Sequence, residues 1–208
     1  MYTRIKTLYK NRAEDNYRRA ANITMGLLAT LLPIVLISGH NLISDSTALL
    51  PSVSHYYYTD MGIFFITALS IFAAFLFITQ TNCSGEKRWT MTAAIGTLGT
   101  ICLPTMPVGS KLNVIYTLHL FFALSLFLAI SILAIRYYSK TGVKKTDRMF
   151  QWAGIGILSS LIVLILFFII ITAAGGHTVD YNVVLYIEAV MITLLGSVWI
   201  LRGSLIKS

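Results

Sequence analysis

Charged residues are scarce in this chain, and acidic residues are the scarcest. Asp and Glu number only 8 and Lys and Arg 16, so charged residues make up 12% of the 208 residues, whereas 56% are hydrophobic. Soluble domains carry about twice that share of charge, so the composition excludes an ordinary soluble globular domain. The apolar residues form runs of about twenty, the length that crosses the hydrocarbon core of a bilayer as a helix.

A disulfide framework and the motifs of soluble enzymes are also missing. The two cysteines, Cys83 and Cys102, are separated by much of a leaflet along one expected helix, too far for a disulfide. The sequence contains no H-E-x-x-H, G-x-S-x-G, P-loop or G-x-G-x-x-G pattern. The net charge of +8 does not indicate nucleic-acid binding, because the basic residues cluster between apolar runs.

The apolar runs predict an all-α fold, a polytopic membrane helical bundle. Lipid cannot satisfy free backbone groups, and the alternating pattern of a membrane barrel occurs nowhere along the chain. Residues 1–19 are expected to form a cytoplasmic basic juxtamembrane segment, and residues 20–208 a single transmembrane domain. We expect about six spans, over residues 20–39, 61–80, 90–107, 113–136, 151–174 and 183–202.

The distribution of basic residues predicts the orientation of the bundle. An even number of spans places both termini on one side, and the positive-inside rule assigns the more basic side to the cytoplasm. Only Lys111 falls on the opposite side, so both termini are expected to be cytoplasmic. The basic residues on the cytoplasmic side are Arg4, Lys6, Lys10, Arg12, Arg18, Arg19, Lys87, Arg88, Arg136, Lys140, Lys144, Lys145, Arg148, Arg202 and Lys207.

Two ionisable residues, His119 and Glu188, fall inside expected spans. Such groups are costly in lipid and mark functional sites by default. Each lies about six residues past the outer boundary of its span, about 9 Å along a helix, so the two share a depth. We expect them to face each other or a common polar pocket, unless they only join two spans by a hydrogen bond. Neighbours at helical spacing are Tyr116, Ser125, Tyr186 and Thr193.

The segment from Pro51 to Asp60 brings further polar groups to the same side. Interfacial tyrosines and helix caps account for part of this composition. Together with the two buried groups, the segment predicts an outward-facing polar pocket in the outer leaflet that binds a lipid headgroup or other small amphiphile. Glu188 is expected to accept hydrogen bonds or a cationic headgroup, and His119 to orient it. The candidate ligand-binding residues are His119, Glu188, Ser52, Ser54, His55, Tyr56, Tyr57 and Asp60.

Two other classes of function use the same residues. An intramembrane lipid hydrolase or transferase needs a serine beside a histidine, or a metal such as zinc held by histidines and carboxylates. Neither spacing is diagnostic, so we assign no catalytic residue, metal site or cofactor. A proton-coupled transporter or channel needs a path to the cytoplasm, but the inner halves of the spans lack charged residues to form one. The residues considered for zinc are His40, His55, His119 and His177 with Asp60 or Glu188.

Short motifs spread over most of the chain resemble one family. The chain is similar to uncharacterised bacterial six-span membrane proteins, distantly grouped with DRAM-type proteins and with lipid-remodelling proteins of GPI-anchor maturation. Many members carry Arg-Asp where this chain has Gly62-Ile63, so an ion pair at that place is not expected here. The matching residues are Ser52-Val53-Ser54, Tyr56-Tyr57, Thr59, Met61, Phe65, Pro104, Leu118-His119, Glu188, Gly196, Trp199, Arg202 and Gly203.

The resemblance implies a six-span fold, a multi-pass location in the bacterial inner membrane and a loose association with membrane lipids. Membrane lipids are therefore the expected partners. A homo-oligomer or a partner within a membrane complex stays open.

Overall fold

The computed structural model describes residues 2–45, 47–79, 83–107, 113–174 and 182–206, with side chains from residue 13 onward. These residues form helices and no strand, which confirms the all-α class. Lys111, His177 and Lys207 lie outside the described residues. The elements are α1 (Tyr2–Ser44), the 3-10 helix η1 (Val53–Tyr58), α2 (Gly62–Ile78), α3 (Ser84–Cys102), α4 (Val114–Ile132), the π-helix η2 (Leu133–Tyr138), α5 (Lys144–Ala173) and α6 (Val183–Ser204).

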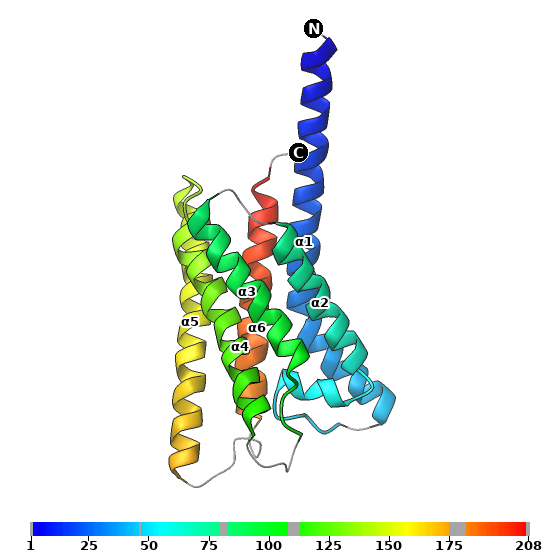
Figure 1. Ribbon diagram of the computed structural model, residues 1–208, viewed down its shortest axis with the longest axis vertical. Helices are drawn as coiled ribbons and strands as arrows, with labels where there is room; N and C mark the ends of the chain where they lie inside the picture. Colours follow the sequence, from blue (N-terminus) through cyan, green and yellow to red (C-terminus); the bar gives the residue numbers. More distant parts are fainter. Residues whose placement is uncertain (1, 46, 80–82, 108–112, 175–181, 207–208) are drawn as a thin grey trace.

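The six α-helices of the described chain run up and down along one bundle (Figure 1). We call the end at which α1 begins and α6 ends the terminal end, and the opposite end, which carries η1, the η1 end. The first part of α1 projects beyond the bundle at the terminal end and is continuous with the rest of the helix. The basic segment expected before the first span is therefore part of the same long helix.

Four of the described helices are long and apolar enough to cross a membrane: Ala13–Ser44 of α1, α4 continued by η2, α5 and α6. α2 is a shorter apolar helix of 17 residues. The third expected span, 90–107, is displaced: α3 begins at Ser84, because the polar Ser-Gly-Glu-Lys-Arg segment is helical, and ends at Cys102. The helix ends there because the residue before a proline, here Leu103, avoids the helical conformation.

Small residues and one aromatic cluster join the helices. A Cβ added at Gly26 of α1 would come within 2.6 Å of the Gly196 carbonyl oxygen of α6, so these two backbones touch directly. Trp199 of α6 is buried against Phe72 and Phe75 of α2 and Tyr138 of η2. These contacts hold α1, α2, η2 and α6 together, and the cavity described next lies between α4, α5 and α6.

Candidate ligand-binding cavity

A cavity of about 230 Å³ lies at the η1 end, between α4, α5 and α6. Pro51, Ser52, Ser54 and His55 contribute to it from the segment that leads into α2. Its polar lining comes from this loop, from Thr105 and from the first turns of α4 and α6. Its apolar lining extends along α4, α5 and α6 toward the middle of the bundle. The polar lining residues are Ser52, Ser54, His55, Thr105, Tyr116, His119 and Glu188.

Glu188 joins α6 to the loop. Its Oε2 accepts a hydrogen bond from the Val53 N–H at 2.7 Å, and the Ser54 N–H lies beside the same carboxylate. One turn earlier, the Leu185 N–H donates to the Pro51 carbonyl at 2.9 Å. Hydrogen bonds to a carboxylate are about twice as strong as neutral ones, so this contact fixes the start of η1 against α6. The rest of the partly buried Glu188 side chain lines the cavity.

His119 joins α4 to the end of α3. Its Nδ1 lies 2.7 Å from the Leu103 carbonyl oxygen, and the residue is only 3% exposed. A carbonyl can only accept, so Nδ1 carries a proton and donates a hydrogen bond to Leu103. The sequence places His119 in this position because Asn113 caps the start of α4 and its side chain accepts a hydrogen bond from the Tyr116 N–H.

Ser52 and His55 form a buried pair at the start of η1. The Ser52 Oγ lies 2.6 Å from His55 Nδ1, and the opposite ring nitrogen, Nε2, is buried without a hydrogen-bond partner among the described residues. Burial, reinforced by His119 nearby, lowers the pKa of His55 to about 4. The Met106 backbone opposes this shift without forming a hydrogen bond to Nε2. His55 is therefore neutral at pH 7, and its Nε2 is free to bind a ligand.

The structure brings five of the sequence-predicted residues to this cavity: His119, Glu188, Ser52, Ser54 and His55. His119 and Glu188 share the cavity as expected, but each binds loop backbone.

The other three predicted residues are not among its lining. Tyr56 is fully buried and packs edge-on against the His40 ring, Tyr57 packs on Tyr58, and Asp60 is exposed.

Of the four residues predicted as neighbours of His119 and Glu188, only one lines the cavity. Tyr116 lines the cavity, whereas Tyr186 and Thr193 are exposed on α6. Ser125 donates a hydrogen bond to the Phe122 carbonyl of its own helix. Helical spacing therefore identified the correct turns of α4 and α6, but not which side chains face inward.

Sequence reasoning did not identify the α5 wall of the cavity. Ile165 and Ile169 line the cavity and keep 39% and 58% of their surface exposed, so the cavity reaches the outer surface of the bundle between helices. The only sequence signal was the almost wholly aliphatic character of this helix, which is typical of any lipid-facing span. The remaining α5 lining residues are Leu161, Leu164 and Phe168.

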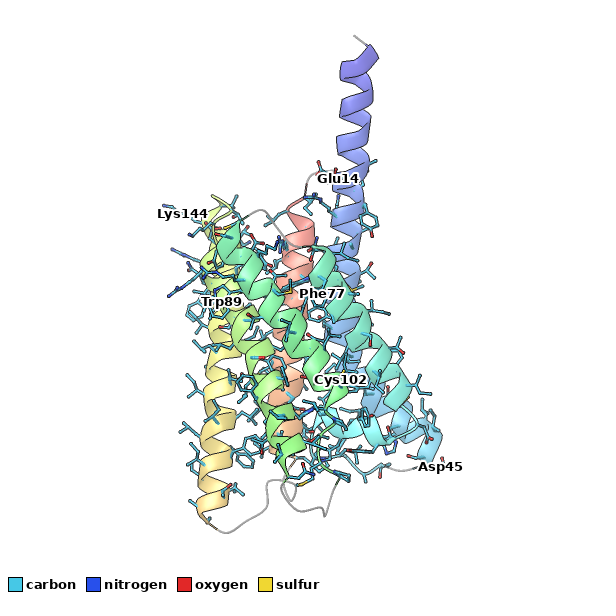
Figure 2. The ribbon with its side chains drawn as sticks, viewed as in Figure 1. Glu14, Asp45, Phe77, Trp89, Cys102 and Lys144 are labelled. Atoms are coloured by element: carbon cyan, nitrogen blue, oxygen red, sulfur yellow. The ribbon has the colours of Figure 1, made fainter. Side chains whose placement is uncertain are left out.

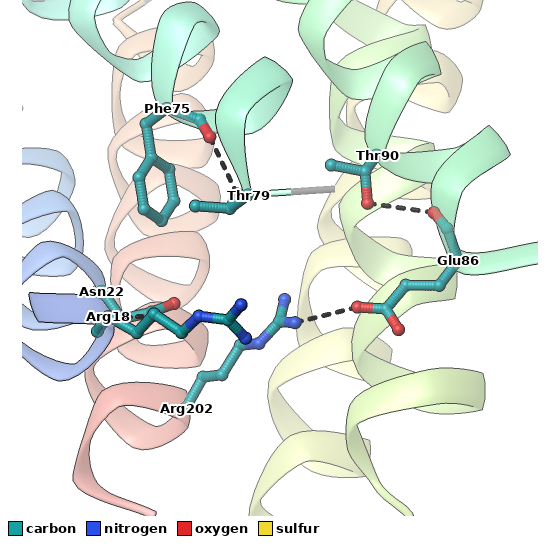
Figure 3. Close-up of polar contacts among 7 residues, drawn as sticks. All are labelled: Arg18, Asn22, Phe75, Thr79, Glu86, Thr90 and Arg202. Carbon is teal, nitrogen blue, oxygen red and sulfur yellow. Dashed lines mark hydrogen bonds and ion pairs between the residues drawn. The ribbon is translucent and has the colours of Figure 1, made fainter. Parts of the chain in front are cut away.

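A second cluster of charged groups lies at the terminal end (Figure 3). Arg202 of α6 binds Glu86 of α3 with 2.9 Å between Nη2 and Oε1, and its guanidinium lies 4.1 Å from the centre of the Tyr138 ring. Thr90 donates to the Glu86 carbonyl one turn away. The Tyr138 hydroxyl has no hydrogen bond of good geometry, although Thr90 and Arg202 lie beside it. We call this pair the Glu86–Arg202 clasp.

No group of three or more His, Cys, Asp or Glu side chains in the described ranges is placed to hold a metal ion, and His177 lies outside them. No model of a protein family, no curated protein and no solved structure matches this chain.

Proposed function

We propose that this chain is a six-span protein of the bacterial inner membrane that binds the head of a lipid or other small amphiphile in the cavity at the η1 end. One observation carries the proposal: a single cavity has polar groups at one end, apolar walls along α4 and α5, and access to the lipid-facing surface at Ile165 and Ile169. Ligand sites are mostly apolar with a few converging polar groups. The resemblance to lipid-associated six-span proteins agrees with this proposal.

The proposed topology counts α2 and α3 as the two spans beyond the four long apolar helices. Their 17 and 19 residues correspond to about 26 and 28 Å, close to the thickness of a thin bilayer. All described Lys and Arg residues lie toward the terminal end, where Figure 2 labels Lys144 and Glu14, whereas Asp45 and Cys102 lie toward the η1 end. The positive-inside rule then assigns the terminal end to the cytoplasm and the cavity to the outer leaflet.

The size of the cavity limits what it holds. Pockets for drug-sized ligands occupy about 300–1,000 Å³, and this cavity has about 230 Å³. A headgroup with the first atoms of a chain fits, and the rest of the chain lies outside, along Ile165 and Ile169. This arrangement favours a lipid or single-chain amphiphile over a fully enclosed soluble ligand.

Native mass spectrometry of protein purified in mild detergent tests the proposal, with Ala123→Phe as the key variant. Ala123 lines the cavity, so the larger side chain fills it without removing a polar group. Ala173→Phe is the matched control, because Ala173 is exposed at the end of α5 and does not line the cavity. We expect a bound amphiphile on the wild type and the control but not on Ala123→Phe. Equal retention by all three proteins would contradict the proposal.

One observation favours a second candidate, an acyl hydrolase or transferase: the Ser52 hydroxyl lies 2.6 Å from a histidine. Acyl transfer also needs donors for the oxyanion, and the two N–H groups that follow Ser52 both lie at Glu188. Binding therefore ranks first. Labelling by a fluorophosphonate probe that is lost in Ser52→Ala but kept in Ser54→Ala would make catalysis the better assignment.

A further inference from the structure

The described lining of the cavity has an acidic side chain but no permanently cationic one. Glu188 is the one acidic residue among the described residues that line it, and these include no Lys or Arg. His55 is held neutral by burial. An anionic head would meet a carboxylate at short range with no cation to compensate, and such repulsion is strong where water is excluded.

The polar atoms of the cavity also keep spare hydrogen-bonding capacity. A carboxylate offers about four lone-pair sites, and the Val53 and Ser54 N–H groups occupy two at most. His55 is 7% exposed and lines the cavity, yet its Nε2 has no partner among the described residues. If His55 Nδ1–H donates to the Ser52 Oγ, Nε2 becomes a hydrogen-bond acceptor. A buried polar atom without a partner is costly, so the Glu188 carboxylate, and His55 Nε2 in this tautomer, favour a ligand that donates hydrogen bonds.

From these contacts we propose that the cavity selects amphiphiles with a primary amine head, whose ammonium donates to the Glu188 carboxylate and to Nε2 of His55. An ammonium offers three donors and one positive charge, which matches a carboxylate with free lone pairs beside an unpartnered acceptor. The inference rests on the proposed function, because it specifies the head of the amphiphile bound there. The chain of the amphiphile follows the apolar α5 wall outward.

Three probes with the same hydrocarbon chain test the charge preference: dodecylamine, monolauroylglycerol and dodecyl phosphate. Binding to the purified protein is titrated by native mass spectrometry. We expect dodecylamine to bind at least about tenfold more tightly than dodecyl phosphate, with the neutral probe between them. Dodecyl phosphate binding as tightly as dodecylamine would overturn this inference and leave the proposed function standing. Failure of all three probes to bind would overturn both.

Two variants test whether the preference for dodecylamine arises in the cavity. Glu188→Gln removes the charge from the cavity, so dodecylamine should lose its advantage while monolauroylglycerol still binds. Asp60→Asn removes the same charge from an exposed position on the same loop and should keep the advantage. The reverse result would place the preference at the protein surface and overturn the assignment to the cavity. The wild-type ranking decides the charge preference by itself if Glu188→Gln does not fold.

Two lipids distinguish the source of the amine. Phosphatidylethanolamine and phosphatidylglycerol with the same acyl chains are compared for retention by the wild-type protein. Selective retention of phosphatidylethanolamine supports the inference with a membrane lipid as the ligand. A preference for dodecylamine with neither lipid retained supports it with a single-chain amine as the ligand.

Discussion

At the terminal end of the bundle, two opposite charges bind each other, whereas at the η1 end a carboxylate and two imidazoles each bind an uncharged group of a neighbouring segment. The Glu86–Arg202 clasp has a partner for each charge and an aromatic ring against the guanidinium. Glu188 accepts a hydrogen bond from the Val53 backbone, and His119 donates one to the Leu103 backbone. Both side chains also line the cavity. Buried or partly buried ionisable residues thus occur at both ends, and spare hydrogen-bonding capacity beside a cavity distinguishes the candidate site from the clasp.

The first prediction breaks the clasp. Glu86→Ala leaves the Arg202 guanidinium, whose side chain is 25% exposed, without its carboxylate. We expect the free energy of unfolding to fall by about 2 kcal/mol, because a partly buried pair lies between an exposed pair and a fully buried one. Denaturant unfolding in detergent micelles measures it.

The matched control for the clasp is Glu14→Ala, which breaks the Arg18–Glu14 pair, where the side chains are 64% and 52% exposed. That change should cost less than about 1 kcal/mol. Similar losses in both variants would show that the clasp is no stronger than a surface ion pair.

The second prediction concerns the corresponding group at the η1 end. Glu188→Leu leaves the Val53 N–H buried without an acceptor and removes the carboxylate beside the Ser54 N–H. We expect η1 to be destabilised by about 2 kcal/mol, the cost of an unsatisfied buried donor. Hydrogen exchange of residues 51–59 should accelerate accordingly.

Glu188→Gln keeps an acceptor oxygen for Val53 and should accelerate exchange much less. Equal acceleration in the Leu and Gln variants would mean that the hydrogen bond depends on the full negative charge.

The third prediction uses pH at the same end. The pKa of His55 is lowered from 6.5 to about 4, so the native protein binds this proton more weakly than the unfolded chain does. The stability from neutral His55 is complete above pH 6.5 and is lost as the pH falls toward 4, by up to about 2 kcal/mol at pH 5. Thermal unfolding at pH 7 and pH 5 measures the loss.

His55→Gln is the control for the pH effect, because it cannot take up the proton. His119 and Glu188 line the same cavity and stay unchanged in this variant, so any pH dependence that remains belongs to them or to other titratable groups of the chain. An unchanged pH dependence in His55→Gln would exclude His55 as its source.

The sequence predicted the helical class and the depth of the site, because both follow from local rules. Apolar runs of spanning length require helices, and residues at equal distance from a span boundary share a depth. Counting along the chain therefore located His119 and Glu188 on one cavity. The start of α3 at Ser84 was missed because the hydropathy of a window does not detect a helix that continues into polar residues.

The partners of these residues were beyond sequence reasoning, because they lie far apart along the chain. Val53 and Glu188 are 135 positions apart, and Glu86 and Arg202 are 116 apart. Arg202 was counted as a topology signal, a role that any basic residue near a span end satisfies. Tyr56 was expected among the ligand-binding residues, but it is fully buried, because η1 turns it toward α1 and the His40 ring.

The last and smallest effect concerns how the loop closes over the cavity. The Tyr58 hydroxyl donates to the Thr105 carbonyl at 2.5 Å, and Thr105 itself lines the cavity, so this bond joins η1 to the segment after α3. Tyr58→Phe removes only the hydroxyl and should cost about 1 kcal/mol or less, because Tyr58 is 47% exposed and water can replace the bond. The global free energy of unfolding should therefore barely change, while a bound amphiphile dissociates several times faster.

Thr59→Ser is a control that keeps the hydroxyl bonded to the Tyr56 carbonyl in the same turn. Faster dissociation in Tyr58→Phe alone would identify the Tyr58–Thr105 bond as the contact that retains the ligand, and equal dissociation rates would mean that the ligand leaves past α5 instead.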